Sequence, residues 1–176
     1  SLSSPGNILE VTAKDMAGNP SLLAFGIFVD TTPPVLSIAS PSPGALLNTR
    51  SPVLTLAYAD ALSGIDPAGI LIEVDGSPAP ASGGGGSGAM ITLPPLPDGP
   101  HEAAARVADK AGNLSLKVTV KFTIDATPPG VVILQPPAGS YFNTSTRALA
   151  AYYEDSGSNL DLAFRAGNEY GVDFNA

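Results

Sequence analysis

The chain has no cysteine, no tryptophan and only one histidine among its 176 residues. Without cysteine it forms no disulfides or thiolate metal sites, and it has no cysteine nucleophile. A single histidine excludes a metal cage built from several imidazoles. The absence of tryptophan leaves only scattered tyrosine and phenylalanine for stacking against sugars. These absences exclude several common kinds of enzyme active site.

Positive charge is also scarce: 8 lysine and arginine residues face 16 aspartate and glutamate residues, giving a net charge of −8. An acidic surface repels phosphate backbones, so nucleic acid is not expected as a partner. No apolar run approaches the ~18 residues of a membrane span. The sequence begins with serine and shows no signal peptide, as expected of a processed or excised piece of a longer protein.

Glycine and proline are abundant instead, with 19 and 18 residues. Helix interiors tolerate neither residue well, so a mainly helical fold is excluded. Apolar segments such as VLTLAYA (53–59) and VVILQ (131–135) can bury a core, which argues against disorder. The composition is therefore neither that of an average helical enzyme nor that of a disordered chain.

Five short motifs occur twice, in the same order, at an offset of 94 residues for the first and 95 for the rest. The pairs are Asp15–Asn19 with Asp109–Asn113, Val29–Pro34 with Ile124–Pro129, Gly44–Thr49 with Gly139–Thr144, Tyr58–Asp60 with Tyr153–Asp155, and Asp60–Asp66 with Asp155–Asp161. Ordered matches at a nearly constant offset indicate an internal duplication.

The position of the repeat units within the chain is unusual. Residues 35–128 make one complete unit, whereas residues 1–34 match only its end and residues 129–176 only its beginning. Read in the order 129–176 and then 1–34, the two pieces make a second unit. The sequence thus predicts one complete domain flanked by two complementary half-domains.

Short apolar segments separated by turn residues predict the strands of the complete unit. The expected strands are Val35–Ala39, Val53–Ala59, Ile70–Val74, Ala89–Leu93, His101–Ala108 and Leu116–Ile124. The dipeptide Asp75-Gly76 predicts a hairpin turn, and Gly112 or Asn113 is expected to take a positive φ. So many strands in about 95 residues favour a Greek-key β-sandwich.

The chain resembles the bacterial Ig-like repeats of large secreted adhesins and other surface proteins. The residues that carry the resemblance are the D-x-A-G-N turns (15–19 and 109–113), the D-x-T-P-P linkers (30–34 and 125–129) and the D-x-x-S-[GN]-[IL]-D loops (60–66 and 155–161). The resemblance implies tandem Ig-like sandwiches at an extracellular or cell-surface location. Domains of this kind serve as stalks, spacers or binding heads.

The resemblance also implies calcium at the junctions between domains, because such ions rigidify some repeats of this family. Carboxylates and loop carbonyls are the ligands that Ca²⁺ prefers. One expected set is Asp30, Asp60, Asp66 and Asp109; the other is Asp125, Asp155, Asp161 and, from the next copy, Asp15, with Glu154 as an additional candidate. The alternative is that these aspartates only cap backbone NH groups in turns.

The division of the second unit between the two ends of the chain favours a structural role. Copies of the chain are expected to join head-to-tail, either by strand complementation or as periods of a longer tandem chain, in a surface filament or adhesin stalk. One alternative is an Ig-like module of a secreted surface protein or hydrolase that binds host or surface glycans or proteins, with the insert Ser77–Met90 as the place of the site. Another is a segment cut without regard to domain boundaries. Catalysis is not expected: His101 has no evident partner and is interpreted as structural. Tyr58 and Tyr153 are interpreted as packing residues.

Overall fold

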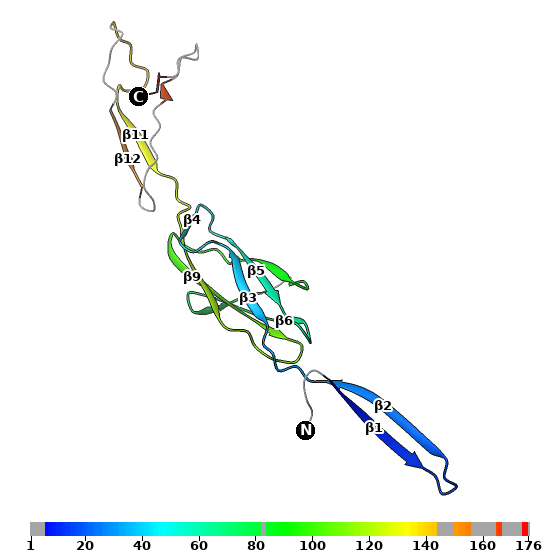
Figure 1. The fold of residues 1–176 in the computed structure, drawn as a ribbon. Coiled ribbons are helices and arrows are strands. Elements are labelled where there is room, and N and C mark those ends of the chain that lie inside the picture. Colours follow the sequence, from blue (N-terminus) through cyan, green and yellow to red (C-terminus); the bar gives the residue numbers. More distant parts are fainter. Residues whose placement is uncertain (1–5, 82–83, 144–149, 156–164, 167–173, 176) are drawn as a thin grey trace. The chain divides into compact units, whose positions relative to one another are not determined.

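A computed structural model of the chain describes residues 6–81, 84–143, 150–155, 165–166 and 174–175. All regular secondary structure in these residues is β-strand, as Figure 1 shows. The described part contains no helix long and apolar enough to cross a membrane. The chain divides into two units, residues 1–124 and 125–176, which are described separately. The expected all-β class is confirmed.

The first unit holds ten strands in its described residues, and the second unit holds four. Those of the first unit are β1 (Gly6–Lys14), β2 (Pro20–Phe28), β3 (Val35–Ser40), β4 (Ala45–Leu47), β5 (Val53–Ala59), β6 (Ile65–Val74), β7 (Ser77–Ala79), β8 (Gly88–Thr92), β9 (Gly99–Asp109) and β10 (Val118–Ile124). Those of the second are β11 (Gly130–Gln135), β12 (Ala150–Glu154), β13 (Arg165–Ala166) and β14 (Phe174–Asn175).

Strands β3 to β10 form a β-sandwich of two sheets (Figure 1). One sheet has the order β4-β10-β9-β6-β7, and the other has the order β3-β5-β8. All neighbouring strands are antiparallel except β4 and β10, which run parallel. The chain changes sheets between β3 and β4. The sandwich predicted from the strand pattern is therefore confirmed.

The core of the sandwich follows from alternation along the strands. In β5, Leu54, Leu56 and Tyr58 are buried while the residues between them are more exposed. Successive side chains of a strand point to opposite faces, so one apolar face of each sheet meets the other. The remaining apolar core residues are Ile65, Ile70, Ile72, Val74, Ala89, Ile91, Leu93, Leu96, Ala103, Ala104, Ala105, Val107, Val120, Phe122 and Ile124.

Two predicted turns are present. Asp75 and Gly76 have φ values of 50° and 78° and connect β6 to β7. Gly112, in the turn after β9, has a φ of 91°. The three-residue strands β4 and β7 were not expected from the sequence, because so short a strand leaves no alternation to read. Both lie at the edges of the five-stranded sheet.

Besides the short antiparallel pair of β13 and β14, two further strand pairs stand outside the sandwich sheets. Strands β1 and β2 form a two-stranded antiparallel sheet, with partners from Gly6↔Phe28 to Lys14↔Pro20. In the second unit β11 pairs with β12, with a register shift between Ile133 and Gln135. Both pairs carry apolar side chains that are exposed in the structure. The division of the chain into one complete domain and two complementary halves stays a prediction.

Candidate metal centre at a pole of the sandwich

Three carboxylates from distant parts of the sequence meet at one pole of the sandwich. Asp30 belongs to the linker before β3, Asp60 follows β5, and Asp109 ends β9. One carboxylate oxygen of each lies within 4.8 Å of the others. The topology explains the meeting, because β5 and β9 end, and β3 begins, at this pole.

Local turns hold two of these carboxylates in place. The Asp60 Oδ1 atom accepts hydrogen bonds from the backbone NH groups of Leu62 (3.1 Å) and Gly64 (2.6 Å). The two oxygens of Asp109 accept bonds from the backbone NH (2.8 Å) and the side-chain amide (2.7 Å) of Asn113. Capping by turn NH groups is common for aspartate, so these contacts fit the alternative that the sequence left open.

Asp30 fastens the linker to the sandwich. Its carboxylate accepts hydrogen bonds from the NH groups of Thr32 and Ser63, both at 2.9 Å. Its carbonyl oxygen accepts a bond of 3.1 Å from the side-chain amide of Asn113. The Ser63 side chain and the Thr32 amide hold the pKa of Asp30 below its ordinary value. Asn113 thus connects the linker to Asp109. Sequence reasoning did not select it as a site residue, although it ends a D-x-A-G-N motif.

The electrostatics of this cluster favour a cation. The Asp60 Oδ2 atom is buried and has no hydrogen-bond partner in the structure. Among the described residues, none of the ion pairs includes Asp30, Asp60 or Asp109. Negative charges this close repel one another unless a cation or a proton compensates them. Oxygen ligands of this kind suit Ca²⁺, whose usual six to eight ligands would also include carbonyls and water.

The other expected ligand of this set lies apart from the cluster. Asp66 is in β6, and its carboxylate accepts a hydrogen bond of 3.0 Å from the NH group of Ala68. Asp66 is not part of the group that the three clustered carboxylates form. Its spacing from Asp60 in the sequence suggested a common site, but in the structure its carboxylate caps the backbone NH group of Ala68.

The second expected set is described only in part. The Asp125 Oδ1 atom is buried without a hydrogen-bond partner. Asp155 follows β12, while Asp161 lies outside the described residues. Glu154 accepts a hydrogen bond of 2.7 Å from the Tyr152 hydroxyl. Asp15, in the turn after β1, is exposed and accepts bonds from Asn19 at 2.9 Å and 2.7 Å.

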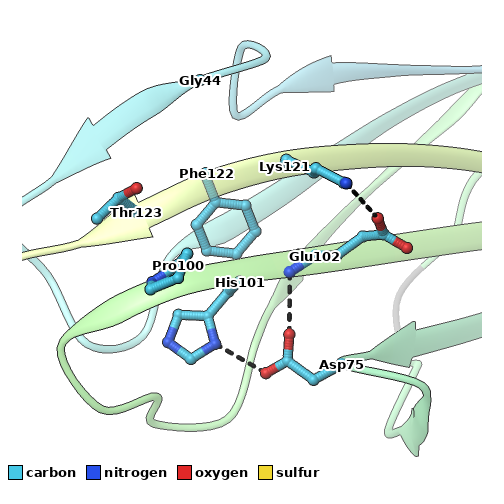
Figure 2. A pocket seen from close by; sticks show the side chains of 8 residues that line it. All are labelled: Gly44, Asp75, Pro100, His101, Glu102, Lys121, Phe122 and Thr123. Carbon is cyan, nitrogen blue, oxygen red and sulfur yellow. Dashed lines mark hydrogen bonds and ion pairs between the residues drawn. The ribbon is translucent and has the colours of Figure 1, made fainter.

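A depression of the surface surrounds His101 (Figure 2). The His101 Nδ1 atom lies 2.7 Å from Asp75 Oδ2, and its Nε2 atom lies 2.9 Å from the carbonyl oxygen of Pro97. Both ring nitrogens are therefore engaged within the fold. A general base needs a nitrogen that faces its substrate. This geometry matches the structural role expected for His101.

The sequence matches no protein-family model. Over 119 residues, 66% of its length, it is 33% identical to halomucin of Haloquadratum walsbyi (strain DSM 16790 / HBSQ001). The matched stretch is 1% of halomucin, so the chain corresponds to a very small part of that protein. The resemblance to bacterial Ig-like repeats thus stays a prediction, while the β-sandwich fold that it implied is confirmed.

Solved structures with a similar fold include three of low sequence identity. CopC from Methylosinus trichosporium OB3b is 23% identical (TM-score 0.41, 52% of this chain, 93% of that chain). A fibronectin(III)-like module structure of Clostridium thermocellum CbhA is 15% identical (TM-score 0.42, 51% and 96%). Dimeric latent PorU from Porphyromonas gingivalis is 19% identical (TM-score 0.44, 74% and 15%). Likenesses of this size do not establish a common function.

Proposed function

We propose that the chain is a structural repeat of a surface or secreted protein, acting in an extracellular filament or adhesin stalk without catalysis. The observation that carries the proposal is that the chain enters and leaves the sandwich at opposite poles. Asp30 of the incoming linker contacts Asn113, in the turn between β9 and β10. Strand β10 then runs away from that turn to Ile124, which pairs with Gly99. Modules threaded in this way join end to end into a linear array.

The likeness to halomucin supports an extracellular location. It covers 66% of this chain but only 1% of halomucin, which fits a module of a much longer protein. The engaged nitrogens of His101 support a module without acid–base chemistry.

Copies of the chain join head-to-tail, either by strand complementation between separate chains or as periods of one tandem polypeptide. The repeat supports this arrangement, because residues 129–176 and 1–34 together make one further unit. The exposed apolar side chains of β1, β2 and β11 support it too, since each strand pair by itself leaves them in water. A two-stranded hairpin is marginally stable alone and gains from a partner.

In this proposal a bound Ca²⁺ ion stabilises the position of the linker 30–34. Asp30, Asp60 and Asp109 hold the ion at the pole and so fix the linker relative to the sandwich. At the junction between copies, Asp125, Asp155 and Asp161 with Asp15 of the next copy form the equivalent set. The turn of Asp15 and Asn19 has the same hydrogen bonds as the turn of Asp109 and Asn113.

Electron microscopy and light scattering of the purified 176-residue chain test the proposal. Linear particles of high mass, growing with protein concentration, are expected. A monodisperse monomer at every concentration would overturn head-to-tail assembly. The intact mass of the native protein then separates the two modes: a mass of about 17.7 kDa indicates separate chains, and a multiple of it indicates a tandem polypeptide.

A further inference from the structure

The hairpin β1–β2 has the register of the hairpin β9–β10 inside the sandwich. Val11 pairs with Leu23 as Ala105 pairs with Val118. The pair Gly6↔Phe28 likewise corresponds to Pro100↔Thr123. Register determines which side chains share a face of a sheet. The hairpin therefore has an inner and an outer face that can be assigned from the complete sandwich.

The inner face of this hairpin lacks the cover that β9 and β10 have. Ala105 and Val120 are 2% and 4% exposed in the sandwich. Val11 and Phe25, at the equivalent positions, are 54% and 45% exposed. The two strands form a sheet by themselves. The hairpin thus presents the apolar face of a sandwich whose opposite sheet must come from elsewhere.

Strands β11 and β12 repeat β3 and β5 in the same manner. Val131 pairs with Tyr153 as Leu36 pairs with Tyr58. The shift between Ile133 and Gln135 matches the shift between Ile38 and Ser40. In the sandwich β3 and β5 belong to the sheet that faces β9 and β10. The chain therefore carries both halves of one further sandwich, each with its own register already formed.

We propose that the hairpin β1–β2 docks on β11–β12 of a second copy, in the register that β4 and β10 define. This rests on the proposed head-to-tail assembly and specifies its contact. In the sandwich Ala45, Leu46 and Leu47 run parallel to Phe122, Thr123 and Ile124. The equivalent contact between copies places Ser140, Tyr141 and Phe142 of one copy beside Ile27, Phe28 and Val29 of the other. This contact is heterologous and propagates along a filament.

A second copy is favoured over the same chain because the linkers are short. Residues 30–34 and 125–129 each reach at most ~17 Å when extended. Strand β10 alone, with seven residues, spans ~23 Å between the two poles. Hydrogen bonds from Ser63 and Asn113 hold Asp30 at its own pole, so the linker 30–34 is not free to reach back along the sandwich. The linker 125–129 alone is shorter than the distance between the poles, so the two halves of one chain do not meet.

Cysteine cross-linking tests the register, and the cysteine-free chain allows it without background. Phe28 and Tyr141 are 85% and 99% exposed, so Phe28→Cys in one preparation and Tyr141→Cys in another leave each fold intact. After mixing and oxidation, a disulfide between positions 28 and 141 is expected. The matched control mixes Leu22→Cys with Tyr141→Cys. Leu22 lies six residues from Phe28 along β2, about 20 Å away, too far for a disulfide in this register.

Peptide mass spectrometry distinguishes the outcomes. A 28–141 disulfide in about ten-fold excess over the 22–141 disulfide supports the register. Equal yields, or no 28–141 disulfide while linear particles still form, overturn the register and leave the proposed assembly standing. The absence of both particles and cross-links overturns the two together.

A second pair of variants tests which face of the hairpin docks. Val11→Lys places a charge on the inner face, while Ile8→Lys places it at the position equivalent to Glu102, on the outer face. Loss of particles with Val11→Lys but not with Ile8→Lys is expected, with the melting temperature of the sandwich unchanged in both. Particles that survive Val11→Lys, or that are lost equally in both variants, would overturn the assignment.

Discussion

The Nδ1 atom of His101 lies 2.7 Å from the Oδ2 atom of Asp75, which joins β9 to the turn between β6 and β7 (Figure 2). The Nε2 atom lies 2.9 Å from the carbonyl oxygen of Pro97. A carboxylate and a carbonyl only accept hydrogen bonds, so both contacts form when the imidazole carries two protons. Burial lowers the pKa of His101, but Asp75 and Pro97 outweigh it and raise the pKa above its ordinary value. The fold therefore stabilises the charged ring.

The stability of the sandwich is expected to fall as the pH rises above ~6.5, the ordinary pKa of histidine. Because the folded pKa of His101 is raised, its stabilisation is fully present below its unfolded pKa of ~6.5 and is lost as the pH rises through the folded pKa. The pKa of Asp75 is lowered by the Glu102 backbone NH and by His101. Its contribution is present above ~3.9 and is lost as the pH falls through the folded value. Denaturant unfolding at several pH values measures both losses of stability, the one from His101 at higher pH and the one from Asp75 at lower pH.

The variant His101→Gln supplies the control for this pH dependence. The chain has no other histidine, so the decline of the unfolding free energy near neutral pH should be much smaller in the variant. An unchanged slope in His101→Gln would show that another group causes it. The variant itself is expected to lower the unfolding free energy by about 1–3 kcal/mol, because it leaves Asp75 without its charged partner.

Glycine at position 84 is expected to be required for packing of the insert. A Cβ atom there would lie 2.5 Å from the Cδ1 atom of Ile70 and 2.8 Å from the Tyr58 hydroxyl. The carbonyl oxygens of Gly85 (2.9 Å) and Gly88 (2.8 Å) both lie within hydrogen-bond distance of that hydroxyl and share its single proton. Gly84→Ala should lower the unfolding free energy by about 1–3 kcal/mol through overpacking. Thermal unfolding measures the loss.

The matched control is Gly86→Ala, where an added Cβ meets no atom within 4 Å. Its unfolding free energy should change by less than about 0.5 kcal/mol. Equal losses of unfolding free energy in the two variants would show that the backbone between Gly84 and Gly86 needs glycine in general, and that the contacts of Gly84 are not the cause.

The sandwich could be predicted from local patterns because its strands alternate apolar and polar residues. The predicted Val53–Ala59 agrees with β5 in both bounds. The predicted Ile70–Val74 covers only half of β6, which begins at Ile65. The missed part includes Asp66, Pro67 and Gly69, residues that predict a loop. The register shift between Ile65 and Ile70 accommodates them in the strand, and alternation cannot reveal such a shift.

The acidic cluster was predictable in outline and not in detail. The Ig-like resemblance placed the Asp60 loop, the Asp109 turn and the linker at one pole, and the structure brings Asp30, Asp60 and Asp109 together there. It could not show that Asn113 reaches across to the Asp30 carbonyl, because that contact depends on how the linker crosses the turn. Side-chain contacts over 83 residues of sequence come from tertiary packing.

Calcium is expected to raise the melting temperature of the chain, and Asp60→Asn is expected to abolish most of that response. The variant keeps the size of the side chain but removes its charge. Asp60 is the clustered carboxylate whose Oδ2 atom is buried without a hydrogen-bond partner. Differential scanning calorimetry with Ca²⁺ or with chelator measures the shift. In chelator the variant should be at least as stable as the native chain, because repulsion among the three carboxylates is reduced.

Asp66→Asn serves as the matched control for the calcium response, since Asp66 lies outside the cluster. It should retain the response of the native chain. A melting temperature that does not change with Ca²⁺ in the native chain would leave the aspartates as turn caps. An equal loss of response in both variants would move the site away from the cluster.

Asn113→Ala is expected to release the linker from the sandwich. The substitution removes the 3.1 Å bond to the Asp30 carbonyl and the 2.7 Å bond to Asp109, whose side chain is then buried with one donor fewer. A loss of about 1–3 kcal/mol in unfolding free energy should result, together with faster proteolysis of residues 30–34. Asn19→Ala removes the equivalent side-chain bond of 2.7 Å from the exposed Asp15 turn and should change neither quantity in dilute solution. Proteolysis that stays slow in Asn113→Ala would show that Ser63 and Thr32 hold the linker without it.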